Sequence, residues 1–164
     1  MPTTMRREAL ISPCERYRYW LLREWDPSCQ MVLWVMLNPS TADATKDDAT
    51  IRRCIEFSRR WGYGSLMVVN LFAYRATAPR ELYRVGLVES VGPDNWTWLE
   101  TMAARTAKGI TAWGNGGYYP RPDLPVHSGG WWHLGMTKNR EPLHPLARGK
   151  SFIPYDRPLT AFAK

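Results

Sequence analysis

Continuous apolar runs alternate with amphipathic segments through the middle of the chain. Residues 31–37 (Met-Val-Leu-Trp-Val-Met-Leu) and 66–71 are apolar at nearly every position, which is typical of strands buried on both faces of a parallel sheet. Residues 109–113 and 131–134 predict two further, shorter strands. Four strands of this kind indicate a buried sheet at the centre of the molecule.

Two helices are predicted between these strands. Asp47 or Asp48 can cap a helix whose apolar side begins at Ile51, and Gly62 stands where helices commonly end. A second helix is expected over residues 94–106, which follow Pro93 and carry an apolar stripe. Helix and strand therefore alternate along the chain.

This alternation predicts the fold class. We expect an α/β protein, a three-layer α/β/α sandwich with a short, mostly parallel central sheet. The chain has 164 residues, of which 45% are hydrophobic, and it contains no repeat or low-complexity segment, so one domain over residues 1–164 is expected. In such sheets, sites lie at the carboxyl ends of the strands. The residues that follow each strand are thus the first candidates for chemistry.

Charge and aromatic content favour an anionic partner. The formal net charge is +7, and nucleic acid is the most common partner of a small basic domain. The 9 Trp and 8 Tyr residues can fill a core, but their faces can also stack on bases and sugars. No apolar run approaches the roughly 20 residues of a membrane span, and the N-terminus does not have the pattern of a signal peptide. A cytoplasmic protein without membrane association is expected.

The cysteines and histidines do not predict a metal site. The three cysteines, Cys14, Cys29 and Cys54, are unclustered, which favours neither a disulfide framework nor a cysteine-ligated metal. The spacing of His127 and His133 matches no standard zinc pattern. We therefore expect no metal and no cofactor.

Each candidate at a strand end has a simple structural explanation when taken alone. Asn38 and Pro39 can form a turn, Asn70 can be a buried amide that satisfies a loop, and His144 can be a surface histidine. Their joint order is more informative.

That order resembles the uracil-DNA glycosylase superfamily. The matching segments are residues 37–40, 69–76, 112–115 and 144–149, so the resemblance covers about residues 31–150. Residues 37–43 (Leu-Asn-Pro-Ser-Thr-Ala-Asp) and 70–77 (Asn-Leu-Phe-Ala-Tyr-Arg-Ala-Thr) also resemble a family of small bacterial and phage proteins. This second resemblance extends over nearly the whole chain and implies no activity.

The glycosylase resemblance implies catalytic roles for three residues. Asn38 matches the position that orients the attacking water, and its amide cannot act as a general base at neutral pH. Asp43 is the candidate carboxylate, with Asp47 and Asp48 as alternatives, although helix capping also explains all three acids. His144 matches the histidine that donates a hydrogen bond to the departing base.

The same resemblance implies a base pocket and a DNA surface. Asn70 matches the amide that reads the hydrogen-bonding edge of the base. The other expected substrate-binding residues are Pro39, Ser40, Tyr74, Arg75, Trp113 and Asn115. Leu146 follows His144 more closely than the family pattern has it and is the candidate wedge into the base stack. The expected DNA-binding residues are Leu146, Arg148, Lys150, Lys138 and Arg140.

These features predict a DNA glycosylase that flips out a modified pyrimidine and hydrolyses its N-glycosidic bond. The small residues 40–42 leave room for a bulky base, such as one carrying a sugar, and excision of phage bases would serve antiviral defence. A monomer that binds DNA is expected. Two alternatives stay open, namely a non-catalytic module that binds modified nucleic acid and an enzyme that acts on free modified nucleotides.

Overall fold

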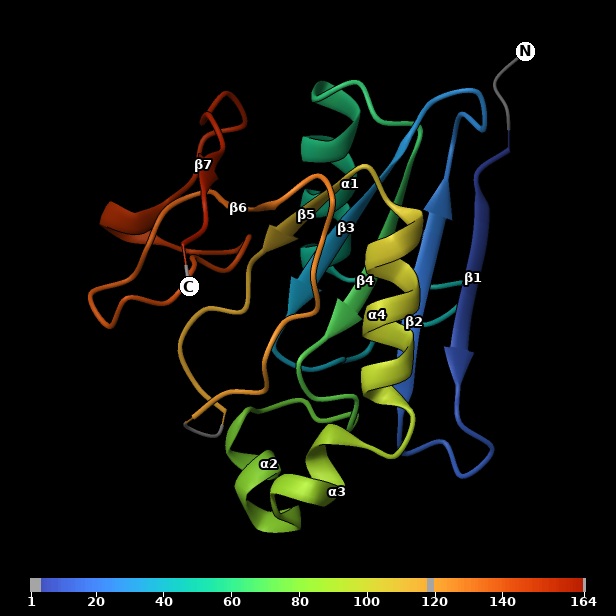
Figure 1. Ribbon diagram of the computed structural model, residues 1–164, viewed down its shortest axis with the longest axis vertical. Coiled ribbons are helices and arrows are strands. Elements are labelled where there is room, and N and C mark those ends of the chain that lie inside the picture. Colours follow the sequence, from blue (N-terminus) through green and yellow to red (C-terminus); the bar gives the residue numbers. More distant parts are fainter. Residues whose placement is uncertain (1–3, 118–119, 164) are drawn as a thin grey trace.

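A mixed β-sheet forms the middle layer of the protein (Figure 1). The computed structural model describes residues 4–117 and 120–163, and within them seven strands join in the order β1-β2-β4-β3-β5-β6-β7. The strands are β1 (Arg6–Ile11), β2 (Arg18–Glu24), β3 (Met31–Met36), β4 (Ser65–Asn70), β5 (Lys108–Thr111), β6 (Trp131–His133) and β7 (Thr160–Ala161).

The four neighbouring strands β4, β3, β5 and β6 are parallel and form the centre of the sheet. Strands β1 and β2 form an antiparallel hairpin that pairs with β4 on one side, and β7 adds an antiparallel edge on the other. The α/β class is therefore confirmed. The prediction of a short, mostly parallel sheet is not, because half of the pairings among the described residues are antiparallel.

The hydrophobic pattern did not indicate the hairpin for a physical reason. Strand β1 is only partly buried, as expected for an edge strand. Strand β2 is almost wholly buried, but Arg18 and Arg23 limit its apolar run to residues 19–22, and both side chains lie inside the protein. Arginine is mostly a surface residue, so a sequence pattern assigns it to the surface unless its buried partners are known.

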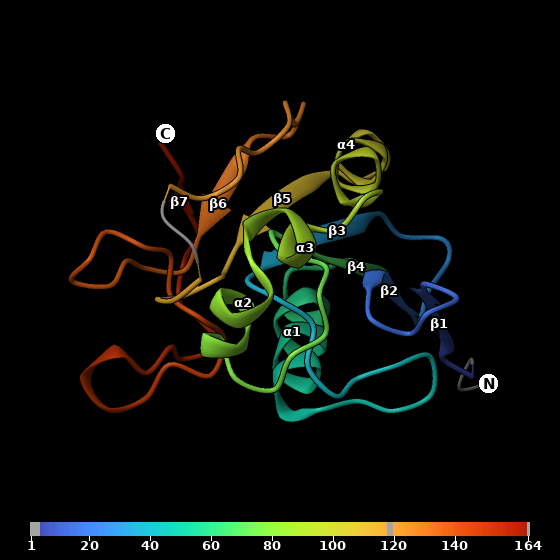
Figure 2. The ribbon, with the colours of Figure 1, turned by 90° about the horizontal axis from the view of Figure 1, so that it is seen from below.

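Helices cover both faces of the sheet (Figure 2). Helix α1 (Ala49–Arg60) packs on one face and α4 (Asn95–Arg105) on the other, each with its own cluster of buried side chains. Two short helices, α2 (Arg80–Val85) and α3 (Leu87–Val91), lie beyond the carboxyl end of β4 (Figure 1), and a 3-10 helix, η1, spans Gly149–Ser151. The predicted helices and the four predicted strands are confirmed, whereas α2, α3 and β7 were not predicted.

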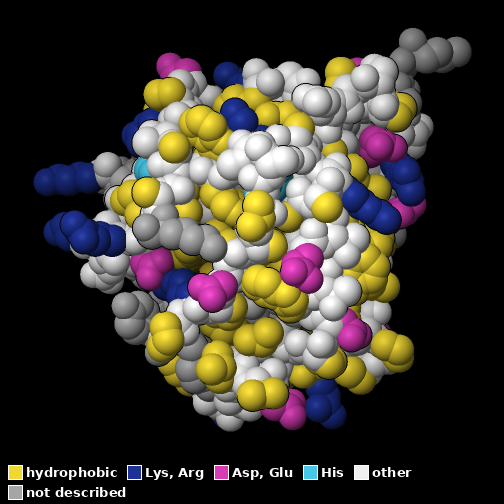
Figure 3. Space-filling model, viewed as in Figure 1, with side chains coloured by type: hydrophobic (Ala, Val, Ile, Leu, Met, Phe, Trp, Pro, Cys, Tyr) yellow, Lys and Arg dark blue, Asp and Glu magenta, His cyan; other side chains and the backbone are white. Residues whose placement is uncertain are grey.

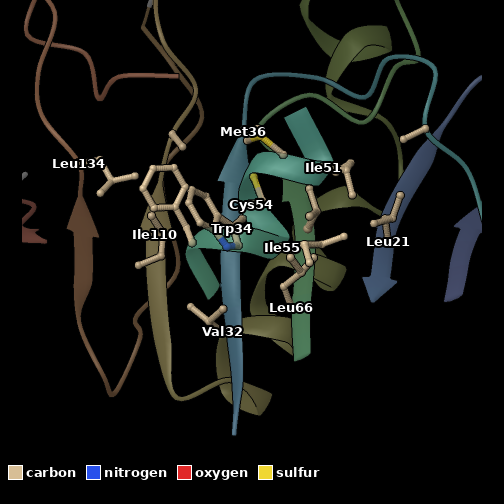
Figure 4. Close-up of a cluster of buried hydrophobic side chains, with 14 of the residues drawn as sticks. Leu21, Val32, Trp34, Met36, Ile51, Cys54, Ile55, Leu66, Ile110 and Leu134 are labelled. Carbon is tan, nitrogen blue, oxygen red and sulfur yellow. The ribbon is translucent and has the colours of Figure 1, made fainter. Parts of the chain in front are cut away.

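Trp34 of β3 fixes α1 against the sheet (Figure 4). Its side chain is fully buried, its Nε1 donates a hydrogen bond to Ser58 Oγ at 3.0 Å, and its ring stacks on Trp61 at 5.6 Å between centroids. A buried tryptophan whose N–H is bonded adds a large apolar area without an unsatisfied donor. These contacts fix the position of α1 on the sheet. The first turn of α1 lies at the carboxyl end of the parallel strands.

Two buried arginines of β2 hold the loop that joins β3 to α1. Arg18 Nη1 donates to the Ala42 carbonyl at 2.7 Å, and Arg23 Nη2 donates to the Asp43 carbonyl at 2.6 Å. Arg23 Nε also pairs with Asp47 at 2.7 Å. This loop follows Asn38, so the hairpin that the sequence did not predict positions the first candidate motif.

Within the described part of the chain, no helix is both long and apolar enough to cross a membrane.

Candidate active site

A cavity of about 370 Å³ lies where the central parallel strands end. Its wall is formed by the start of β2, the ends of β3 and β4 with the segments that follow them, the segment after β5, the first turn of α1 and His144 from the segment that precedes η1. The carboxyl edge is where the fold class places a site. Asn38, Asn70 and His144, which lie far apart in sequence, all line this cavity.

Asn38 follows β3, and backbone carbonyls fix its amide. Its Nδ2 donates to the Ala76 carbonyl at 2.8 Å and to the Pro39 carbonyl at 3.1 Å. Only the nitrogen of an amide can donate to carbonyl oxygens, so the orientation of the group follows from its partners. Oδ1 is left as the acceptor that Asn38 can offer to a water molecule.

Asn70, the last residue of β4, is 1% exposed and lines the same cavity. Both its Nδ2 and its Oδ1 are buried without a hydrogen-bond partner among the described residues. A buried polar group left unsatisfied costs about 1–3 kcal/mol, so an amide with two such atoms is expensive to keep. A ligand edge with one donor and one acceptor would satisfy both atoms at once.

His144 presents a single donor to the cavity. Its Nδ1 accepts a hydrogen bond from the Leu146 N–H at 3.1 Å, and an acceptor nitrogen carries no proton. Burial lowers the pKa of His144, against an opposing effect of the Asp48 carboxylate. The neutral ring therefore has its proton on Nε2. Gly114 makes room for this residue, because its φ is +67° and a Cβ there would lie 3.2 Å from the Cβ of His144.

Of the three acidic candidates, Asp48 alone lines the cavity. Asp43 turns its carboxylate to two backbone N–H groups of its own loop, and these bonds lower the pKa of Asp43. Asp47 forms ion pairs with Arg7 and Arg23. Asp48 Oδ1 caps α1 by accepting the Ile51 N–H at 2.9 Å, so this residue is both a helix cap and the carboxylate of the cavity.

Arg18 is a wall residue that the sequence reasoning missed. It begins β2, is 2% exposed and lines the cavity together with Asp48. The available signal was an arginine inside the otherwise aromatic and apolar segment of residues 17–22. The sequence alone does not tell whether such an arginine lines a site or lies on the surface.

The comparisons with known proteins place the chain in a family. Residues 18–146 match the model of the family described as "Protein of unknown function (DUF1643)". The chain belongs to this family. Its matched region begins at Arg18 and extends beyond His144, so it includes every residue of the cavity wall. No curated protein and no solved structure matches the chain.

Within the region shared with the DUF1643 family, the structure brings together part of the predicted site. The predicted residues that line the cavity are Asn38, Ser40, Asn70, Trp113, Asn115 and His144. Trp113 is held in the wall by a hydrogen bond from its Nε1 to Glu141 at 2.6 Å. These residues come from four separate segments, and the parallel strands make them neighbours.

Four of the predicted catalytic and substrate-binding residues lie outside this cavity. The Asp43 carboxylate accepts hydrogen bonds from backbone N–H groups of its own loop. Pro39 is buried and contributes its carbonyl to Asn38. Tyr74 packs its ring edge-on against Tyr17, and Arg75 donates to the Glu15 carbonyl at 3.1 Å.

The predicted DNA-binding residues lie in the segments after β6. Leu146 is partly buried and is not part of the cavity wall. The other four of these residues, Lys138, Arg140, Arg148 and Lys150, are exposed. On the face seen in Figure 3, hydrophobic side chains are spread over most of the surface, including the lower part, where α2 and α3 lie in Figure 1. The exposed large hydrophobic residues of α2 and α3 are Tyr83, Leu87 and Val88, and the predicted phosphate contacts come from other segments.

Among the residues that the structure describes, no group of three or more His, Cys, Asp and Glu side chains is arranged to hold a metal ion. Cys14, Cys29 and Cys54 are free thiols.

Proposed function

We propose that this protein is a DNA glycosylase that hydrolyses the N-glycosidic bond of a modified pyrimidine flipped out of DNA. The observation that supports this most strongly is the buried Asn70 amide, which has two unpartnered polar atoms and shares a cavity with Asn38 and His144. These are the three positions to which the resemblance to the uracil-DNA glycosylase superfamily assigns base reading, water positioning and donation to the departing base.

The base would enter the cavity with its hydrogen-bonding edge toward Asn70. An amide pairs one donor and one acceptor on a pyrimidine edge, which would relieve the unsatisfied Nδ2 and Oδ1. The Trp113 ring, fixed by Glu141, offers an apolar wall for the ring of the base. A volume of about 370 Å³ lies within the range of small-molecule sites and leaves space for an adduct on the pyrimidine.

Hydrolysis of the N-glycosidic bond separates charge between the sugar and the base, and the cavity offers a group that can stabilise each of them. As the bond between C1′ and the base nitrogen breaks, positive charge develops on the sugar and the bonding electrons leave with the base. Asn38 Oδ1 would orient the water whose oxygen bonds to C1′, and Asp48 would stabilise the sugar cation and accept the proton of that water. His144 would donate from Nε2 to an oxygen of the departing base.

The DNA would be held outside the cavity by the segments after β6. Flipping a nucleotide costs a few kcal/mol of stacking and pairing, and phosphate contacts together with an apolar wedge offset that cost. Lys138, Arg140, Arg148 and Lys150 are the exposed cations proposed for the phosphates, and Leu146 is the proposed wedge. In this proposal the protein acts as a monomer in the cytoplasm, and excision of phage-modified bases serves antiviral defence.

The test is mass spectrometry of the bases released from a panel of DNAs with unmodified, uracil-containing and phage-type modified pyrimidines. We expect one class of modified pyrimidine to be released, with alkali-labile abasic sites left in the strand. The Asn38→Ala variant is the matched control, and it should bind the same DNA without releasing the base.

Two results would overturn the proposal. Binding of modified DNA without release of any base would identify a non-catalytic module. Release from mononucleotides but not from DNA would identify an enzyme of free nucleotides, for which DNA affinity should also depend little on salt.

A further inference from the structure

Arg18 is a buried cation that uses little of its hydrogen-bonding capacity. Its guanidinium has five N–H donors, and the bond that the described residues provide runs from Nη1 to the Ala42 carbonyl at 2.7 Å. Nε is buried and has no partner in that part of the chain. The side chain is 2% exposed and lines the cavity. A charge in such a place is costly unless a partner is bound.

The charges around Arg18 do not neutralise it directly. Asp48 and Asp43 attract the guanidinium, Arg75 and Arg23 repel it, and it forms no ion pair with a carboxylate of residues 4–117 or 120–163. Burial lowers the pKa of Arg18 to about 10, so the side chain is still a cation at neutral pH. It is the one cation of the cavity wall among the described residues, because His144 is neutral.

We propose that Arg18 binds an oxygen of the departing base and stabilises the negative charge that develops on it. This inference rests on the proposed function. The cavity wall contains one cation, Arg18, and one carboxylate, Asp48, and the transition state has one anionic and one cationic part. A cation beside the sugar would oppose the charge that develops there, so Arg18 belongs on the side of the base and Asp48 on the side of the sugar.

Arg18 adds what His144 cannot supply. A neutral imidazole gives the leaving base one uncharged donor, whereas a hydrogen bond from a cation is roughly twice as strong as a neutral one. The donor is also preorganised, because the Ala42 carbonyl and the surrounding sheet hold the guanidinium before substrate binds. Preorganised donors aimed at developing charge are commonly the largest contribution to catalysis.

The test compares single-turnover excision rates of the wild type and Arg18→Met on oligonucleotides with 5-substituted pyrimidines that differ in the acidity of N1. We expect Arg18→Met to be slower by about 100-fold or more on the least acidic leaving base, as when one oxyanion donor is removed. The loss should shrink as the leaving base becomes more acidic, because such a base needs less help. Arg18→Lys keeps a cation and should recover part of the rate.

Arg23→Met is the matched control. Arg23 holds the same loop as Arg18 but does not line the cavity, so any loss of rate should be equal across the series of bases. Folding of every variant is checked by circular dichroism and thermal melting. If Arg18→Met does not fold, Arg18→Gln, which can still donate to the Ala42 carbonyl, replaces it.

An equal loss across all bases in a folded Arg18 variant would mean that Arg18 only holds the loop, and the inference would be wrong while the glycosylase proposal stood. Failure of the wild type to release any base would overturn both.

Discussion

Backbone groups fix the orientation of two polar side chains in the cavity. Asn38 is held through its Nδ2 by two carbonyls, and His144 through its Nδ1 by the Leu146 N–H. Each is left with one defined group to offer, an oxygen on Asn38 and an N–H on His144. Asn70 differs, because neither of its polar atoms is bonded to a described residue. The oriented oxygen of Asn38 and N–H of His144, together with the unsatisfied amide of Asn70, are the arrangement expected of a preorganised ligand-binding site.

Asn38→Ala should abolish turnover while the protein still binds DNA. Orientation of water matters in the transition state far more than in substrate binding, so we expect excision to fall by at least about 100-fold with little change in Kd. Asn139, an exposed asparagine outside the cavity, gives the control Asn139→Ala with a rate near that of the wild type. Unchanged base release by a folded Asn38→Ala protein would contradict the role of Asn38.

His144→Ala should slow excision by about 100-fold if it removes one donor to the leaving base. His133 provides a close control, since its Nδ1 also accepts the N–H two residues ahead, from Gly135 at 3.0 Å, but it does not line the cavity. His133→Ala should therefore keep its activity. Equal losses in the two variants, measured as single-turnover rates, would point to a shared structural role.

At the scale of elements, the apolar runs were enough to predict the centre of the fold. Strands β3 and β4 are buried on both faces, so nearly every position is apolar, and α1 has a clear cap and end. The β1–β2 hairpin could not be predicted, because Arg18 and Arg23 break its pattern and their partners are distant in sequence. Short helices such as α2 and α3 have too few turns for a periodic signal.

In the candidate site too, local features could be predicted from the sequence and contacts between distant segments could not. Strand ends are local features, so Asn38 and Asn70 could be found from the runs that precede them, and the resemblance added His144. The choice among three nearby acids depends on how the loop folds, and Asp48 lines the cavity whereas Asp43, which the sequence favoured, does not. No local pattern reveals which side a loop carboxylate faces.

The attachment of the β3–α1 loop to β2 predicts a large stability effect. Arg23 is fully buried, pairs with Asp47 and donates to loop carbonyls, so Arg23→Leu leaves those carbonyls without their partner and Asp47 with the ion pair to Arg7 alone. Breaking a buried pair on one side costs about 3–5 kcal/mol, and we expect a loss of that order in the free energy of unfolding. Arg6→Leu, which removes an exposed pair with Glu8 on β1, should change stability far less in the same urea titrations. Similar losses would contradict the structural role of Arg23.

Leu146 tests how the segment after β6 meets DNA. A wedge is needed only where a base stack must be opened, so Leu146→Ala should slow excision from duplex DNA more than from single strands. The partial burial of Leu146 also allows a packing role, which would affect both substrates equally. Excision rates on matched single- and double-stranded oligonucleotides separate the two, and equal defects would remove the wedge assignment.

For the whole molecule, three histidines link stability to pH. Burial lowers the pKa of His127, His133 and His144 below the usual value near 6.5. As pH falls below 6.5, the unfolded chain takes up protons at these rings before the folded protein does. The unfolded state then binds more protons, and stability must decrease on acidification until the folded rings protonate as well.

We therefore expect the free energy of unfolding to decrease between pH 7 and about pH 5. The carboxylates whose pKa is lowered, Asp26 and Asp43, have usual values near 3.8, so they contribute below this window. Urea titrations at constant ionic strength measure the decrease, and His133→Gln should reduce it by removing one titrating ring that lies outside the cavity. Constant stability across this pH range would mean that the histidines are as easily protonated in the folded protein as in the unfolded chain, and the neutral state assigned to His144 would lose its support.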